Sequence, residues 1–170
     1  MPNDISKIRS LVDLYGFAVD TRRWALFDKV FSPNMHIDYG GDALWTDLEK
    51  FKEDFEAFHR IFDATHHSMA NFIPDIKGDT ATTVTYGHWL IVRKGIEGGD
   101  IWRGNGWYDD EWIRGPEGWR ITRRRVRIIH WEGSTAIISP DGFQVPMEVT
   151  SLYHAAQAGE IPLLASLNIA

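Results

Sequence analysis

The sequence predicts an α+β fold in which N-terminal helices cover the concave face of a strongly curved, mostly antiparallel sheet. Two observations predict this fold. Apolar residues recur every three or four positions up to about residue 62, as in amphipathic helices, and alternate with polar residues from Ala64 onward, as in strands. Turn residues divide this second part into four long segments. Helices followed by strands are typical of the α+β class.

Three helices are predicted before the first long strand. The first covers about residues 4 to 19, and the second covers about residues 24 to 31 and ends before Pro33, because proline disfavours helix in the residue before it. The third begins at a capping-box pattern of Thr46 and Glu49. Their apolar stripes are Ile5, Ile8, Val12, Tyr15 and Val19; Trp24, Phe27, Val30 and Phe31; and Leu48, Phe51, Phe55, Phe58 and Phe62.

The strands follow from alternation and turn residues. A short strand over residues 35–39 is ended by Gly40-Gly41. The long strands are expected at roughly 64 to 76, 80 to 94, 100 to 113 and 119 to 131. Each is longer than the usual five or six residues, and strands of this length imply a strongly bent sheet.

The C-terminal stretch and the outer face of the sheet lead to two further expectations. Residues 147 to 160 are expected to form a terminal helix with Val149, Leu152, Tyr153 and Ala156 facing inward. An open curved sheet with aromatic and arginine side chains on its outer face favours burial by a second copy. We therefore expect a homodimer or homotrimer.

Composition limits the class of protein. The length of 170 residues and a hydrophobic fraction of 44% suit a single domain with one core. Without cysteine there is no disulfide framework, and the charged N-terminus lacks a signal peptide's apolar run, so we expect a cytoplasmic protein. A net charge of −6 argues against nucleic acid as a partner. No apolar stretch approaches the roughly 20 residues that span a bilayer.

Asp20 and His67 are the leading catalytic candidates. If the fold brings them together, the carboxylate orients the imidazole and makes it a general base. Met69 and Asn71 share the His67 side of their strand, whereas His66 points the other way, unless a bulge reverses the choice. Two plainer alternatives are a hydrogen-bonded core role for His67 and a helix-capping role for Asp20.

Arg124 is the third candidate. On the last long strand it shares a face with the apolar Val126, whereas Arg123, Arg125 and Arg127 share the opposite face and suit a solvated surface or a subunit contact. An inward guanidinium needs a carboxylate partner or an anionic ligand, because an unpaired buried charge costs several kcal/mol.

Tryptophan is abundant, with eight residues in the chain. This abundance is compatible with a flat or aromatic ligand, although packing of the sheet and a subunit interface is the better explanation for most of the tryptophans. We assign Trp24, Trp89 and Trp107 to the substrate pocket, together with Met69 and Asn71.

The order of elements and four local markers resemble the SnoaL-like families of the nuclear transport factor two superfamily, which are cone-shaped α+β barrels. The resemblance covers roughly residues 5 to 131 and leaves 132–170 as a C-terminal extension of the single domain 1–170. The markers are residues 14–20 (LYGFAVD), 65–71 (THHSMAN), 78–81 (GDTA) and 118–121 (GWRI).

Within that superfamily the chain is similar to the branch that contains scytalone dehydratase, bile acid 7α-dehydratase and hexachlorocyclohexane dehydrochlorinase. These enzymes use a His-Asp dyad to remove a proton next to a leaving group. The resemblance implies that His67 and Asp20 form the dyad, that Arg124 helps to bind substrate or leaving group, and that Tyr15 is a pocket tyrosine. His88 is a weaker match to a second histidine of scytalone dehydratase, and a one-residue shift would put Trp89 in the pocket instead.

We therefore expect a cofactor-independent lyase that acts on a hydrophobic, cyclic small molecule. One alternative is an isomerase or cyclase of the ketosteroid or polyketide type, in which Asp109 or Asp110 would imitate the acid of a later strand. Another is a non-catalytic ligand-binding or structural subunit, similar to the small subunits of ring-hydroxylating dioxygenases. A metal enzyme would need His36, Asp38 and His67 to converge, and we expect no metal.

Overall fold

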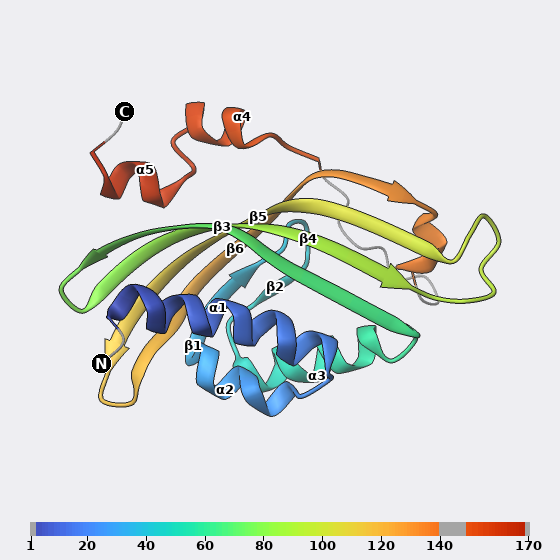
Figure 1. The fold of residues 1–170 in the computed structure, drawn as a ribbon, viewed down its shortest axis with the longest axis horizontal. Helices are drawn as coiled ribbons and strands as arrows, with labels where there is room; N and C mark the ends of the chain where they lie inside the picture. Colours follow the sequence, from blue (N-terminus) through green and yellow to red (C-terminus); the bar gives the residue numbers. More distant parts are fainter. Residues whose placement is uncertain (1–2, 140–148, 169–170) are drawn as a thin grey trace.

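The computed structural model describes residues 3–139 and 149–168, and its main feature is one curved, unclosed sheet of six strands (Figure 1). Their order across the sheet is β2-β1-β6-β5-β4-β3. All neighbouring strands are antiparallel except β1 and β6, which are parallel. The strands are β1 (Phe31–Asp38), β2 (Leu44–Trp45), β3 (Ala64–Lys77), β4 (Thr80–Val92), β5 (Ile101–Gly115) and β6 (Gly118–Gly133).

Helices lie on both faces of this sheet (Figure 1). On the concave side lie α1 (Asp4–Asp20), the 3₁₀ turn η1 (Trp24–Leu26), α2 (Phe27–Val30) and α3 (Leu48–His59), and on the opposite side lie α4 (Leu152–Gln157) and α5 (Pro162–Ser166). A second 3₁₀ turn, η2 (Thr135–Ile137), follows β6. None of the helices within residues 3–139 and 149–168 combines the length and the apolar character needed to cross a bilayer.

The two helix layers enclose separate apolar clusters. The larger cluster joins the stripe of α1, where Ile8 and Val12 are fully buried, to the aromatic side chains of α3 and to the inner face of the sheet. The smaller cluster lies on the other face, where Trp107 of β5 and Val84 of β4 pack against the C-terminal helices. The concave side, between α1, α3 and the sheet, therefore holds the main core.

The structure confirms the predicted α+β class, the N-terminal helix and the four long strands within a few residues. Three local predictions were wrong. The short strand begins at Phe31 and contains Pro33, so the second helix is shorter than expected. The N-cap of α3 is Asp47, whose carboxylate accepts the Lys50 backbone N–H at 2.8 Å, and Thr46 does not have this role.

The predicted single C-terminal helix is also wrong, because two short helices replace it within the described residues. Gly159 separates α4 from α5 with a φ of +70°, a value that glycine adopts without strain. Val149 and Tyr153, expected to face inward, are 53% and 68% exposed, and Ala155 is the buried residue of α4. Residues 147 and 148 of the predicted helix lie outside the described residues.

Candidate functional site

Asp20 and His67 meet on the concave side of the sheet. Asp20 is the last residue of α1, and one carboxylate oxygen, Oδ1, lies 2.7 Å from Nδ1 of His67 on β3. The other oxygen, Oδ2, accepts the backbone N–H of His67 at 2.8 Å. Asp20 does not cap the second helical segment, since Arg23 takes the N-cap position of η1 and no side chain bonds there. The carboxylate therefore holds both the backbone and the ring of His67.

A second layer of hydrogen bonds fixes the carboxylate. The Thr65 hydroxyl donates to Asp20 Oδ1 at 3.0 Å, and Arg22 Nη1 donates to the Thr65 hydroxyl at 2.8 Å. Arg22 adopts a φ of +58°, a left-handed conformation that costs a non-glycine residue about 1–2 kcal/mol. Partial burial raises the pKa of Asp20, but the hydrogen bonds from His67 and Thr65 and the charge of His67 lower it below the ordinary 3.8. The carboxyl is thus ionised at neutral pH.

Close packing of α1 against β3 brings the two residues together. Gly16, one turn before Asp20, lies where a Cβ atom would meet Cβ and the carbonyl oxygen of His67, both at 3.3 Å. Contacts this short are tighter than nine in ten Cβ contacts, so a side chain here would require the helix or the strand to shift by a few tenths of an ångström. Glycine at this position places the end of α1 within hydrogen-bonding reach of β3.

A buried histidine near the dyad escaped the sequence analysis. His59, in the last turn of α3, is 4% exposed, and its Nδ1 lies 2.7 Å from the carbonyl oxygen of Phe55. Burial lowers its pKa from 6.5 to about 3, helped by the charges of His67 and Arg22. His59 is therefore neutral, its Nδ1 carries the donated hydrogen, and its Nε2 is an acceptor without a hydrogen-bond partner among the described residues.

A signal for His59 was present in the sequence. It follows Phe55 by four positions and therefore lies on the apolar stripe of its helix. Aromatic rings surround it, with the centroid of Trp24 at 5.3 Å and that of Phe55 at 5.0 Å. Trp24, which we assigned to the pocket, thus lies in the 3₁₀ turn after α1 and packs against α3. The dyad and His59 share an aromatic environment at this end of the sheet.

Tyr15 and Arg124 lie deeper on the same side. The Tyr15 hydroxyl is 2.6 Å from that of Tyr39, and its ring meets the His67 ring edge-on with centroids 6.4 Å apart. The Arg124 guanidinium carbon lies 4.2 Å from the Tyr15 ring centroid, in cation–π contact. Arg124 also makes two hydrogen bonds of 2.7 Å to the Asp110 carboxylate. The inward arginine therefore has the carboxylate partner that its burial requires.

Arg124 does not line an open site, contrary to the sequence assignment. Both side chains of the Arg124–Asp110 pair are 0% exposed. Burial lowers the pKa of Arg124, but the charge and hydrogen bonds of Asp110 raise it above its ordinary value, so the guanidinium stays charged. Arg124 Nη1 is buried without a hydrogen-bond partner among the described residues. Arg124 therefore contacts the ring of Tyr15 from within the core.

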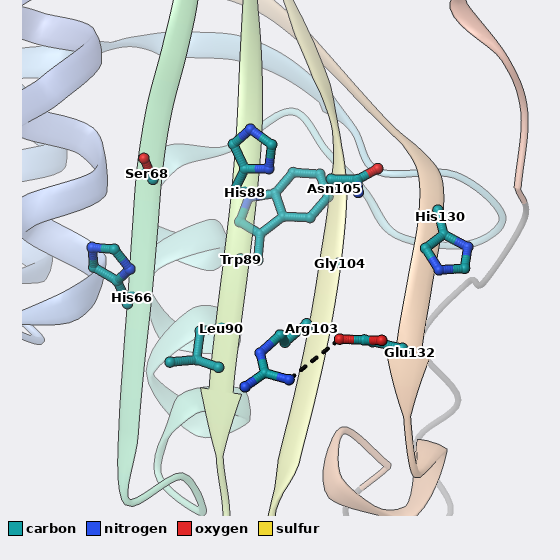
Figure 2. Close-up of a pocket in the computed structure, with 10 residues that line it drawn as sticks. All are labelled: His66, Ser68, His88, Trp89, Leu90, Arg103, Gly104, Asn105, His130 and Glu132. Carbon is teal, nitrogen blue, oxygen red and sulfur yellow. Dashed lines mark hydrogen bonds and ion pairs between the residues drawn. The ribbon is translucent and has the colours of Figure 1, made fainter.

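Three residues assigned to the pocket lie elsewhere. Asn71 falls at a bulge of β3, where it has a φ of +27°, and its side chain is exposed. His88 is exposed on the opposite face of the sheet (Figure 2), and Trp107 is fully buried there beneath the C-terminal helices. By contrast, Trp89 and Met69 lie in the main core, and the Trp89 indole donates to the Tyr108 hydroxyl at 2.6 Å. In β4 it is therefore Trp89, and not His88, that faces the concave side.

In this structure neither Asp109 nor Asp110 is placed to act as the acid of the isomerase alternative. Asp110 is bound to Arg124, and Asp109 lies on the face with Trp107, whose indole N–H donates to Asp109 Oδ2 at 2.7 Å.

The three residues of the alternative metal site do not converge. Asp38 pairs with Arg127 at 2.8 Å and His36 is exposed, and no group of three or more potential metal ligands is found in the described part of the chain.

Asp109 is expected to make the free energy of unfolding depend on pH. Burial raises its pKa from 3.8 to about 7, against the lowering effect of the Trp107 hydrogen bond. Since the folded state holds this proton more tightly than the unfolded state, Asp109 destabilises the fold progressively as pH rises from about 4 to 7. The stability advantage of Asp109→Asn over the wild type should be about 2–3 kcal/mol larger at pH 8 than at pH 5.

Urea unfolding of both proteins at the two pH values measures this difference. Asp42→Asn is the matched control, because Asp42 is exposed and its carboxylate makes no hydrogen bond or ion pair with a described residue. A stability gain in Asp109→Asn that is the same at pH 5 and pH 8 would show that Asp109 ionises normally in the folded protein.

Comparison with known sequences identifies the family. A family model described as a SnoaL-like domain matches residues 2–125. An uncharacterized protein of Mycobacterium tuberculosis is 33% identical over 126 residues, covering 72% of this chain and 83% of the relative.

Solved structures share the fold. A protein from Kribbella flavida superposes with a TM-score of 0.73 at 25% identity, covering 76% of this chain and 93% of its own. A candidate scytalone dehydratase from Novosphingobium aromaticivorans gives 0.68 at 18% identity, covering 75% and 85%. A type 2 hexachlorocyclohexane dehydrochlorinase gives 0.66 at 16% identity, covering 80% and 93%. At this level of identity, the last two structures show a likeness of fold alone.

Proposed function

The chain belongs to the SnoaL-like family, and on that premise we propose that it is a cofactor-independent lyase for a hydrophobic, cyclic small molecule, with His67 as the general base. The observation that carries the proposal is the 2.7 Å contact between His67 Nδ1 and Asp20 Oδ1. Neighbours that share the fold include a candidate scytalone dehydratase and a dehydrochlorinase, and they support the same class of reaction.

The contact assigns the proton of the histidine ring. Because Asp20 is ionised, it accepts the Nδ1 hydrogen, which leaves the Nε2 lone pair of His67 as the basic site. Nε2 makes no hydrogen bond to any described residue. When it takes a proton from a substrate carbon, the imidazolium forms next to a carboxylate that stabilises its charge. Asp20 therefore orients the base and offsets the charge that develops.

The elimination follows from that proton transfer. The electrons of the broken C–H bond form a C=C bond, and the leaving group departs with its own bonding pair. If the leaving group is hydroxide, one further proton converts it to water. The Tyr15–Tyr39 pair suits this role, because one hydroxyl hydrogen lies between the two oxygens and the other is left to donate. Burial raises the pKa of both tyrosines, so both remain neutral donors.

The surroundings of the dyad support a hydrophobic substrate. Only 9% of the His67 side chain is exposed, so a bound ligand replaces little water around the base. Trp24, Phe55 and Phe62 supply aromatic surface around His59, whose neutral Nε2 is left as an acceptor for a ligand donor. A cyclic molecule with one hydroxyl or N–H group matches this combination.

Exchange of a substrate proton with deuterated solvent tests the proposal. A panel of cyclic hydroxy-ketones is incubated with the protein in D₂O, and deuterium incorporation and dehydration are followed by mass spectrometry. His67→Ala should lose on the order of 10²- to 10⁴-fold in rate, the range of general-base catalysis. His66→Ala should retain it, because His66 lies on the opposite face of the same strand (Figure 2). An equal loss in both variants would refute His67 as the base.

A further inference from the structure

A second concave region lies on the sheet face opposite the dyad. It has a volume of about 360 Å³ and is lined by side chains of β3, β4, β5 and β6 (Figure 2). His66, the neighbour of the proposed base, lines this outer hollow. The C-terminal helices cover Trp107 and Val84 on the same face.

The floor of the hollow is a row of polar residues that crosses the sheet. Ser68 pairs with His88, His88 with Asn105, and Asn105 with His130, so these four side chains stand next to one another on successive strands. Neighbouring strands lie about 4.8 Å apart, which puts the two imidazoles roughly 10 Å apart with Asn105 between them. Two histidines at this separation can reach one small ligand above the amide.

Most polar side chains that line the hollow have no partner within the protein. The side chains of His66, His88, Asn105 and His130 make no hydrogen bond or ion pair with any described residue. His66, His88 and His130 are exposed and Asn105 is half-buried, so all four side chains are accessible to a ligand. Here the available groups are ring N–H donors and a side-chain amide, both of which bind anionic oxygens well.

The charges around the hollow favour an anion. Arg103 is in the adjacent row and contributes a positive charge, partly offset by Glu132 at 3.2 Å. The other groups facing the hollow that can carry charge are the three histidines, which all become cationic on protonation.

We propose that the outer hollow binds a small oxyanion, a phosphate or carboxylate group, between His88 and His130 above Asn105. Arg103 adds a charge-assisted hydrogen bond when it turns from Glu132 toward the ligand. Protonation of the histidines strengthens binding, so affinity falls as pH rises. This site is independent of the proposed lyase activity, because it lies on the other face of the sheet.

Isothermal titration calorimetry with inorganic phosphate and, separately, with citrate at pH 5.5 and pH 8 tests the proposal and distinguishes the two oxyanion classes. At least one of the two should bind saturably at pH 5.5 and at least tenfold more weakly at pH 8. The double variant His88→Gln, His130→Gln should lose at least tenfold in affinity at pH 5.5. His36→Gln, which removes an exposed histidine from β1, should bind as the wild type does.

Two outcomes would overturn the proposal. One is the absence of saturable binding at pH 5.5, or binding that the double variant retains. The other is self-association: if sedimentation shows a dimer, and the double variant abolishes it, then the histidines serve an interface between copies. Substitution of exposed side chains leaves the core intact, and circular dichroism of the variants checks this.

Discussion

Arg124→Met is expected to destabilise the folded protein by about 3–5 kcal/mol, because it removes one partner of a fully buried ion pair. Asp110 would keep a carboxylate in the core without its two hydrogen bonds from Arg124. The cation–π contacts with Tyr15 and Tyr108 would be lost as well. Urea unfolding at neutral pH measures the change as a lower midpoint.

The double variant Arg124→Met, Asp110→Leu separates this cause from a simple loss of packing. With both charges removed it should regain most of the lost stability, since apolar replacement of a complete buried pair is often neutral or stabilising. Arg123→Met is the matched control, because Arg123 is exposed and lies 3.9 Å from Glu111. A change below 1 kcal/mol in Arg124→Met would mean that the pair contributes no more than a surface contact.

Asp20→Asn is expected to reduce kcat on the order of 10²- to 10⁴-fold with a smaller effect on KM. The amide is nearly the same size as the carboxylate but carries no charge, so it does not stabilise an imidazolium at His67. It also offers an N–H donor next to Nδ1, which favours the tautomer with hydrogen on Nε2. The protonated form of His67 would then be less stable, and the neutral ring would carry its hydrogen on the wrong nitrogen.

Kinetics of the exchange reaction on the same panel of hydroxy-ketones measures this loss. Asp13→Asn, on the exposed side of α1, is the control, because Asp13 forms only an ion pair with Arg9 on the surface. If Asp20→Asn retained wild-type kcat while His67→Ala lost it, His67 would act without its carboxylate partner.

The sequence predicted the fold because its hydrophobic residues recur at different spacings in the helices and in the strands. Hydrophobic spacing separated α1 and α3 from the four long strands, and the turns at Gly78 and Gly118 marked the hairpins. The two short C-terminal helices were predicted less well. Their few buried positions, Ala155 and Leu163, do not make a periodic stripe. A helix of five or six residues is stabilised by tertiary contact more than by its own pattern.

The sequence predicted that Asp20 and His67 could meet but not which side chains surround them. Alternation along β3 correctly placed His67 and His66 on opposite faces, because the bulge comes later, between Ala70 and Phe72. The same rule failed for Asn71, which lies at that bulge. It also assigned Arg124 inward without revealing its partner, since Asp110 lies on the adjacent strand and cross-strand register is a tertiary property.

The nitrogen-15 chemical shifts of the His67 ring test the central claim, that Asp20 prepares this histidine as a base. In the wild type at pH 8, Nδ1 should carry the hydrogen and Nε2 should show the shift of an unprotonated nitrogen, whereas in Asp20→Asn this preference should weaken or reverse. A wild-type spectrum with the hydrogen on Nε2 would contradict the account, because that nitrogen would have no lone pair with which to take a substrate proton.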